Sequence, residues 1–223
     1  MSTTKISYGV KILKVNPENL RESKEAIEEA VEVIRKGGVI VYPTDTLYGL
    51  GADATNEVAV RRVFKIKKRP ETKPVPVIIS DLEMAKKLAY FDKKIEKILF
   101  SIWPEAVTVL LEKKYTLPEI VTAGQRMIAL RLPDYKIAHF LVVKSGVPLI
   151  ATSANISDQP ASNKIKEVLK QFAGGYYKPD LVLDAGDLKF SQASTILDLS
   201  RDKPKILRVG PVSKKKLFEI IGV

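Results

Sequence analysis

The sequence predicts an α/β domain in which helices pack around one twisted sheet. Short apolar runs alternate along the chain with segments whose apolar residues recur at helical spacing, a pattern typical of layered α/β proteins. The chain has 223 residues, a length that suits one large domain or two small ones. The connections between the segments are short, and we find no repeat, low-complexity tract or flexible linker. We therefore expect a single domain.

The first half of the chain is expected to alternate strand and helix. Asn16-Pro17 ends the first strand, Gly37-Gly38 ends the first helix, and Asn56 is a suitable N-cap for the second helix. The expected elements, in order, are a strand over Val10–Val15, a helix through Ala26, Ile27, Ala30, Val31 and Ile34, a strand over Val39–Tyr42, a helix through Val60, Val63 and Phe64 to about Ile66, and a strand over Val77–Ser80.

The second half continues the alternation. Asp81 and Asp92 are suitable N-caps for a short helix and a longer one, and Pro133 closes a later strand. The longer helix buries an apolar face made of Ile95, Ile98, Leu99 and Ile102. The remaining strands are expected over Val107–Leu111, Met127–Leu132, Val147–Ile150, Leu181–Leu183, Thr195–Leu199 and Ile206–Val209, and the remaining helices near Asp134–Lys144, near Lys164–Phe172 and after Ser213.

The amino-acid composition excludes several kinds of site. Cysteine is absent, which removes disulfide scaffolds, thiol nucleophiles, iron–sulfur clusters and cysteine zinc sites. The single histidine, His139, excludes a His-rich metal site, and its place in a helical pattern favours a structural or exposed role. We assign no residue as a metal ligand. No apolar run approaches the ~18 residues that a membrane span requires, and Met1–Lys14 lacks the layout of a secretion signal, so we expect a cytoplasmic protein without a membrane partner.

The charge of the chain is strongly positive. It carries 37 Lys and Arg against 26 Asp and Glu, a formal net charge of +11. Such an excess favours polyanionic partners, either nucleotide phosphates or an RNA backbone. A lysine-rich surface of the thermophilic type would produce the same excess, and the charge alone does not choose between the two interpretations.

A polar segment, Tyr42 to Gly51, follows a buried strand. Its threonine, aspartate and tyrosine side chains offer hydrogen-bond donors and acceptors, and its two glycines would let backbone amides approach a ligand closely. The spacing Gly49-x-Gly51-x-x-Ala54 imitates a dinucleotide fingerprint, but the first glycine does not directly follow the strand, and the chain about 20 residues on is basic. The segment is either a ligand-binding turn or an ordinary one.

Cations gather at the end of the second helix, in Lys65-Ile66-Lys67-Lys68-Arg69-Pro70, with Lys73 beyond them. One interpretation is that they only complement the helix dipole. Pro70, Pro74 and Pro76 stiffen the chain that follows, and this favours an ordered anion site in which arginine offers a planar fork to carboxylate or phosphate. The sequence lacks the P-loop motif, so ATP would be held in another way.

Two further groups of residues follow apolar runs. Ala151-Thr152-Ser153-Ala154-Asn155 follows the strand at Val147–Ile150, and open α/β sheets bind ligands at such strand ends. Arg131 and Arg208 each close an apolar run, and with Ser194-Thr195 they could face a shared concavity. The alternatives are an ordinary loop in the first case and surface cations in the second.

Taken together, these segments resemble the YrdC-like family of L-threonylcarbamoyl-AMP synthases. The match extends over about residues 22–211, and the order and spacing of its motifs make it specific. The matching stretches are Lys36-Gly37-Gly38, Tyr42 to Gly51, Lys67-x-Arg69-Pro70-x-x-Lys73-Pro74, Trp103-Pro104, Thr122-Ala123-Gly124, Ala129-Leu130-Arg131-Leu132-Pro133, Ser153-Ala154-Asn155, Ser194-Thr195-Ile196 and Ile206-Leu207-Arg208.

The resemblance implies a single three-layer domain over residues 1–223, α+β in strict schemes, with a large twisted mixed sheet and a basic concave cavity. It implies a nucleotidyltransferase that forms threonylcarbamoyl-AMP and pyrophosphate from L-threonine, bicarbonate or CO2, and ATP. Mg²⁺ would accompany ATP, and no prosthetic group is expected. A downstream threonylcarbamoyl transferase would modify tRNA beside the anticodon, and any contact of this chain with tRNA would be made to phosphates.

The resemblance also marks site residues. The family signature, Lys-x-Arg with Ser-x-Asn, gives the catalytic residues Lys67, Arg69, Ser153 and Asn155. Threonine is expected to contact Thr46, Arg69, Arg131 and Ser194. The nucleotide is expected to contact Lys67, Arg69, Lys73, Ser153, Asn155 and Arg208.

A few positions depart from the family pattern. Glu105-Ala106 replaces the usual Gly-Pro after Trp103-Pro104, Val209 replaces a proline, and Ile78 stands where longer relatives tend to have histidine. The last difference concerns the selectivity for threonine. The second C-terminal domain of longer members is not expected, since the chain ends at Val223.

Two other functions are compatible with the sequence. One is a non-enzymatic maturation factor of the same family that binds double-stranded RNA or tRNA, which the charge of +11 suits equally well. Aromatic residues make up only 7% of the chain, which argues against base stacking. The other is a carbamoyl-transfer domain like that of hydrogenase maturation proteins, which the absence of cysteine and the length of the chain disfavour.

Overall fold

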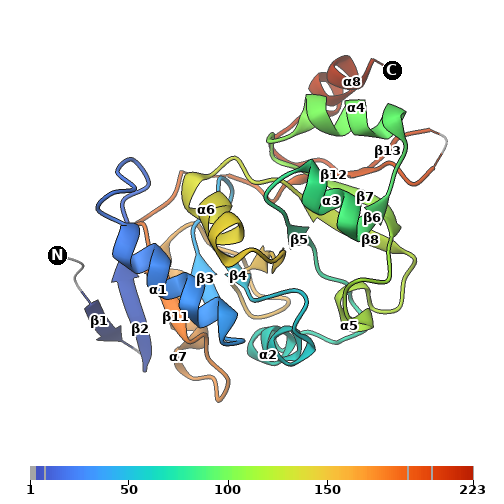
Figure 1. Cartoon of the computed structure of the whole chain (residues 1–223). Coiled ribbons are helices and arrows are strands. Elements are labelled where there is room, and N and C mark those ends of the chain that lie inside the picture. The colour runs from blue at the N-terminus through green and yellow to red at the C-terminus, as the bar shows by residue number, and fades with distance from the viewer. Residues whose placement is uncertain (1–3, 8, 190, 202, 223) are drawn as a thin grey trace.

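Two mixed sheets form the centre of the structure, a computed structural model that describes residues 4–7, 9–189, 191–201 and 203–222 (Figure 1). The first sheet has the order β1-β2-β11-β3-β4-β10, and the second has the order β13-β12-β7-β8-β5-β9, with β6 paired to β7. The strands of the first sheet are β1 (Thr4–Ser7), β2 (Val10–Lys14), β3 (Ile40–Tyr42), β4 (Gly49–Gly51), β10 (Thr152–Ser153) and β11 (Leu181–Asp184). Those of the second are β5 (Val77–Ile78), β6 (Ala89–Tyr90), β7 (Val107–Lys113), β8 (Met127–Arg131), β9 (Leu149–Ile150), β12 (Thr195–Asp198) and β13 (Lys205–Arg208).

Helices cover both faces of the first sheet. On one face, α1 (Lys24–Arg35) and α6 (Lys136–Ser145) pack against Ile40 and Tyr42 of β3. On the other, α2 (Glu57–Lys67) and α7 (Ile165–Ala173) belong to the core that contains Val41. Because successive side chains of a strand point to opposite faces, β3 contributes to both cores and is therefore apolar throughout.

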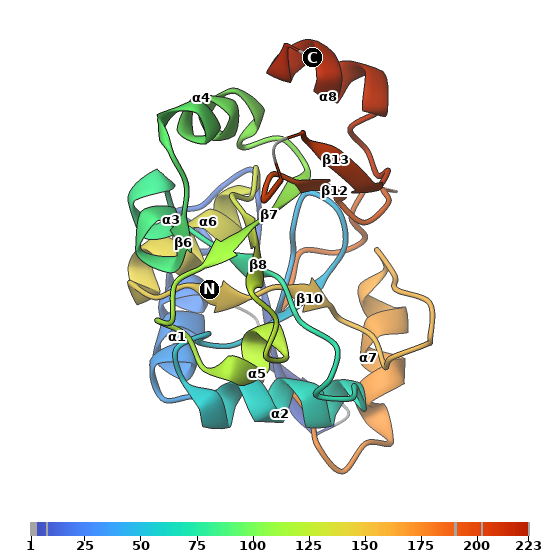
Figure 2. The same ribbon diagram turned by 90° about the vertical axis from the view of Figure 1, so that its right-hand side faces the viewer.

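The remaining helices are associated with the second sheet. They are α3 (Leu82–Leu88), α4 (Lys93–Ile102), α5 (Glu119–Thr122) and α8 (Lys214–Ile221). The helices α4 and α8 pack together beyond the edge formed by β12 and β13 (Figure 2), and their buried residues Leu99 and Leu217 belong to the same core as Val41. Within the described ranges, no helix is both long and apolar enough to cross a membrane.

The elements expected from the sequence are present, with ends that differ by a few residues at most. The helix starts are confirmed in detail, because each expected N-cap side chain accepts a backbone N–H from the first turn of its helix. These N-caps are Asn56, Asp81, Asp92 and Ser213. The sequence pattern does not predict β1, β4, β6, β10 or α5. His139 lies half-buried on α6, within the helix expected there.

The expectation of one continuous sheet is wrong, because the strands are divided between two sheets. The chain passes from the second sheet to the first within Leu149–Ser153, where β9 ends and β10 begins. An isolated bridge between Asp53 and Leu149 joins the two sheets there, with hydrogen bonds of 2.8 Å from Ile150 N to Ala52 O and 2.9 Å from Ala54 N to Pro148 O. A switch made within five residues leaves the alternation of strands and helices unchanged, so the sequence pattern does not reveal it.

Candidate active site

A cavity of about 480 Å³ lies where residues of the two sheets and their loops face each other. Three arginines, Arg69, Arg131 and Arg208, line it, and no Asp, Glu or Lys of the described residues does. The rest of the wall is made of hydroxyl, amide and apolar side chains. Hydroxyl groups from both sheets contribute to it, among them Thr46, Thr108, Ser153 and Ser194. The cavity is therefore positively charged and rich in hydrogen-bonding groups.

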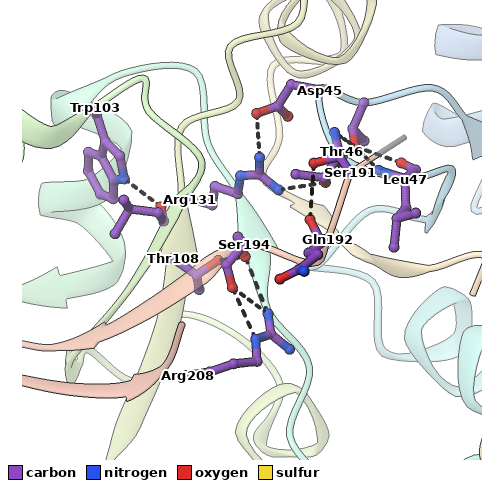
Figure 3. Close-up of polar contacts among 12 residues, drawn as sticks. Asp45, Thr46, Leu47, Trp103, Thr108, Arg131, Ser191, Gln192, Ser194 and Arg208 are labelled. Atoms are coloured by element: carbon purple, nitrogen blue, oxygen red, sulfur yellow. Dashed lines mark hydrogen bonds and ion pairs between the residues drawn. The ribbon is translucent and has the colours of Figure 1, made fainter. Parts of the chain in front are cut away.

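Arg131 is the most buried of the three arginines, with 8% of its surface exposed. It leaves the end of β8, and its Nη2 lies 2.5 Å from Asp45 Oδ2 in an ion pair, while Nη1 donates to Thr46 Oγ1 at 3.3 Å (Figure 3). The Thr44 hydroxyl holds this turn by accepting from the backbone N–H of Thr46 and Leu47 at 3.1 and 3.2 Å. Asp45 belongs to the polar segment seen in the sequence, but its pairing with Arg131 is visible only in the structure.

Arg208 is held against Ser194 from the other side of the cavity. Its Nε and Nη2 donate to Ser194 O at 3.0 and 2.7 Å (Figure 3). The Ser194 hydroxyl lies 2.7 Å from the Thr108 hydroxyl of β7. Burial lowers the pKa of Arg208 below its ordinary value, and the positive charge of Arg131 lowers it further. Two guanidinium groups that disfavour each other's charge are stabilised when an anion binds between them.

The backbone around Gly210 packs closely against Ser194 and fixes its position. Gly210 N donates to Thr195 Oγ1 at 2.9 Å, and that hydroxyl donates to Val212 O at 2.6 Å. A Cβ atom at Gly210 would lie 2.7 Å from the carbonyl carbon of Ser194. Only glycine therefore allows the chain after β13 to pass this close to Ser194.

Arg69 reaches the cavity from the loop after α2. Its Nε donates to Lys73 O at 3.2 Å and its Nη2 to Pro74 O at 2.8 Å, so the proline-rich loop orients the guanidinium. Burial lowers the pKa of Arg69, and the negative charge of Asp158 counteracts this effect. The side chain of Lys73 is exposed and is not part of the cavity wall.

The four residues of the Lys-x-Arg and Ser-x-Asn signature lie close together. Lys67 Nζ donates to Ser153 O at 2.5 Å, to Asn155 O at 2.8 Å and to Asn155 Oδ1 at 3.1 Å. Arg69 and Ser153 line the cavity, whereas Lys67 and Asn155 are buried behind its wall. Burial lowers the pKa of Lys67 to about 7, and the positive charge of Arg69 adds to this effect.

The two glycines of the polar segment lie against the ring of Tyr42. Gly49 pairs with Tyr42 across β3 and β4. A Cβ atom at Gly49 would lie 2.9 Å from Tyr42 Cζ, and one at Gly51 would lie 2.7 Å from Tyr42 Cε1. The glycines therefore make room for the Tyr42 ring, which itself lines the cavity.

The chain matches proteins of known families over most of its length. The family model described as "Telomere recombination", Sua5_yciO_yrdC, matches residues 32–210. The chain is 34% identical over 207 residues to the threonylcarbamoyl-AMP synthase of Pyrococcus abyssi, covering 92% of this chain and 60% of the relative. It is 36% identical to a putative threonylcarbamoyl-AMP synthase of Methanocaldococcus jannaschii, covering 93% of this chain and 96% of the relative.

The solved structures agree with the sequence comparisons. The crystal structure of P. abyssi Sua5 complexed with L-threonine superposes with a TM-score of 0.87 and 34% identity, covering 95% of this chain and 61% of that one. The chain thus spans about 60% of the length of its P. abyssi relative, and nearly the full length of the M. jannaschii one. The matched residues include every motif on which the resemblance rests, from Lys36 to Arg208. The chain belongs to the Sua5/YciO/YrdC family and corresponds in length to its short form.

Proposed function

We propose that the chain is an L-threonylcarbamoyl-AMP synthase, which forms threonylcarbamoyl-AMP and pyrophosphate from L-threonine, bicarbonate or CO2, and ATP. One observation carries the proposal: a single cavity presents three arginines and several hydroxyl groups, without a carboxylate in its described wall. A nucleotide triphosphate and a small amino acid both offer anionic groups to such a wall. The names of the relatives and the threonine complex of P. abyssi Sua5 support the same reaction.

The reaction suits a site without an activated nucleophile on the protein. The amine of threonine and CO2 form an N-carboxylate with release of a proton. An oxygen of this carboxylate attacks the α-phosphorus of ATP, the bond from that phosphorus to the bridging oxygen breaks, and pyrophosphate leaves. Negative charge develops on phosphoryl oxygens, so fixed cations and hydrogen-bond donors can supply the catalysis. Alignment of the three reactants supplies several more kcal/mol, up to about 7–11 in favourable cases.

The geometry supports an assignment of the side chains. We assign threonine to the part of the cavity where Thr46, Arg131 and Ser194 lie, since Arg131 and Arg208 flank it there. We assign the phosphates to Arg69, Ser153 and Arg208, and we propose that Arg69 also contacts the carboxylate of threonine. Lys73 is exposed on the loop that holds Arg69, and its contact with ATP would be made from the rim of the cavity.

ATP would enter as its magnesium complex, in which phosphates and water supply most of the ligands. In the described part of the chain, no group of three or more His, Asp or Glu side chains is placed to hold a metal ion. The product would pass to a threonylcarbamoyl transferase that acts on tRNA, and any tRNA contact would be made by the basic surface with phosphates. We expect the protein to carry out this reaction in the cytoplasm.

An RNA-binding maturation factor is the second candidate, and the net charge of +11 is the observation that favours it. Its defining property would be RNA binding without threonine-dependent use of ATP. The same assay therefore separates the two candidates.

The test replaces Arg69 by alanine and measures pyrophosphate release with ATP, Mg²⁺, bicarbonate and L-threonine. We expect Arg69→Ala to keep the fold and to lose threonine- and bicarbonate-dependent release, because the variant removes the guanidinium that lines the cavity. Arg126→Ala is the matched control, since Arg126 is an exposed arginine paired with Glu112 outside the cavity. An unimpaired rate in Arg69→Ala would remove Arg69 from the site.

A further inference from the structure

Lys67 is a buried cation whose ammonium group donates its hydrogen bonds to Ser153 and Asn155. Only 2% of its surface is exposed, and it is not among the residues that line the wall. An ammonium group has three N–H donors, and Lys67 Nζ has three acceptors, at 2.5, 2.8 and 3.1 Å. Each donor is thus matched by an oxygen of Ser153 or Asn155, and none remains for a phosphate.

The acceptors of Lys67 belong to one tight turn. The Ser153 hydroxyl donates to Asn155 Oδ1 at 2.5 Å, and Asn155 N donates to Ser153 O at 2.9 Å. Asn155 Nδ2 extends the network by donating to Ile156 O and Gln159 O at 2.9 and 2.6 Å. Asn155 is itself 7% exposed. The turn is therefore a closed set of hydrogen bonds centred on the Lys67 ammonium.

The backbone of α2 adds a second attachment. Ser157 N donates to Lys67 O at 2.7 Å, so the same residue holds the segment after β10 with both its side chain and its carbonyl group. Figure 2 shows this segment leading from β10 toward α7, on the side of the molecule where α2 also lies. Of the residues that Lys67 contacts in this way, Ser153 reaches the cavity.

We infer that Lys67 is a positioning residue, which acts on the substrates through the turn at Ser153–Asn155 and not by direct contact with phosphate. Its role is to fix the Ser153 hydroxyl and the adjoining backbone in the cavity wall. This inference rests on the proposed function only in that ATP is taken as the ligand of that wall. The inference separates the signature into two pairs: Arg69 and Ser153 face the ligand, and Lys67 and Asn155 hold Ser153 in place.

The three acceptors also imply a dependence on protonation. The charged amine has one donor for each acceptor, whereas the neutral amine has two donors and a lone pair that would face an oxygen. Burial and the positive charge of Arg69 place the pKa of Lys67 at about 7, and among the described residues Arg69 is the charged side chain that acts on it. As pH rises through this pKa, the turn loses one of its charge-assisted hydrogen bonds, and ATP affinity should fall.

The first experiment needs no ligand. Hydrogen exchange at the backbone amides of Asn155 and Ser157 is compared between the wild-type chain, Lys67→Met and Lys68→Met. Lys68 is an exposed cation at the end of the same helix, so its variant changes the net charge equally. We expect exchange to become about tenfold faster or more in Lys67→Met, the change that follows the loss of charge-assisted hydrogen bonds, and to remain unchanged in Lys68→Met. Unchanged exchange in a folded Lys67→Met would overturn the inference.

The second experiment measures ATP affinity between pH 6 and pH 9 for the same three proteins. We expect the ATP affinity of the wild type and of Lys68→Met to fall as pH rises above about 7. The ATP affinity of Lys67→Met should lack this fall, because the titrating amine is gone. Parallel profiles in all three would contradict the inference. If Lys67→Met does not fold, exchange in the wild type at pH 6 and pH 9, corrected for intrinsic rates, gives the same test. A wild type that binds no ATP would instead refute the proposed function and leave the exchange result intact.

Discussion

Arg131 brings a charge to the cavity that its neighbour Asp45 partly neutralises. The two side chains are 10% and 16% exposed, so each would lose most of its hydration without the other. Removal of one partner of a buried pair leaves the second charge uncompensated, at a cost of about 3–5 kcal/mol. The ion pair with Asp45 therefore allows a charged guanidinium to stay buried in the cavity wall.

Replacement of Asp45 by alanine tests this role. We expect Asp45→Ala to lower the free energy of unfolding by about 3 kcal/mol, because Arg131 stays buried with Thr46 as its remaining partner. Glu112→Ala is the control, since the pair of Arg126 and Glu112 is 80% and 50% exposed and contributes less than about 1 kcal/mol. Denaturant unfolding measures both, and equal effects would show that the Asp45 pair is not desolvated.

The site residues differ in how far the sequence predicts them. The lining of one cavity contains five of the side chains that the motifs indicate: Arg69, Arg131, Ser153, Ser194 and Arg208. The support behind the wall was not predictable, because it depends on contacts between distant parts of the chain: Thr108 meets Ser194 86 positions away. The same holds for Lys67, whose residue type predicts a phosphate ligand, while its burial and its partners are visible only in the fold.

At the level of elements, local signals account for what was predicted. A helix start needs only an N-cap side chain and the first turn, so Asn56 or Asp92 is sufficient to mark it. Two of the strands that the sequence does not predict, β4 and β10, are short and are glycine-rich or polar. Gly49–Gly51 becomes β4 only because β3 pairs with it, and Thr152–Ser153 becomes β10 only because β4 lies beside it. No pattern within such segments indicates a strand.

The pairing of β3 and β4 leads to a prediction about Gly49. A Cβ atom there would lie 2.9 Å from Tyr42 Cζ, and the buried ring has little room to move. We expect Gly49→Ala to lower the free energy of unfolding by about 1–3 kcal/mol, as overpacking does. The change in the Tyr42→Ala background should be smaller, because the ring is gone. Denaturant unfolding of the two single variants and the double variant provides the cycle.

Gly174 supplies the matched control for this prediction. A Cβ atom at Gly174 would meet nothing within 4 Å, and its φ is −89°. Gly174→Ala should therefore leave the protein equally stable or raise its stability by about 0.4–1 kcal/mol. If Gly49→Ala were as harmless as Gly174→Ala, the ring of Tyr42 would not be the reason for the glycine.

At the scale of the whole molecule, the cavity depends on the division into two sheets. Thr46 follows β3 of the first sheet, and Arg131 ends β8 of the second, yet their side chains are hydrogen-bonded. The alternation of strands and helices predicts the class of the fold but not this division, since the switch occupies only Leu149–Ser153. The resemblance to a family predicts that the site residues converge on one cavity, which composition and periodicity do not predict.

The proposed reaction joins an amino acid, bicarbonate and ATP in this one cavity. The most direct measurement incubates the chain with ATP, Mg²⁺, ¹³C-bicarbonate and either L-threonine, L-serine or L-valine, and identifies the adenylate product by mass. We expect a labelled threonylcarbamoyl-AMP, formed with pyrophosphate only when all three substrates are present. Because Ile78 lies in the cavity wall, the yields with serine and valine measure the selectivity for threonine. A chain that binds RNA but forms no labelled adenylate with any of the three amino acids would contradict the proposed reaction.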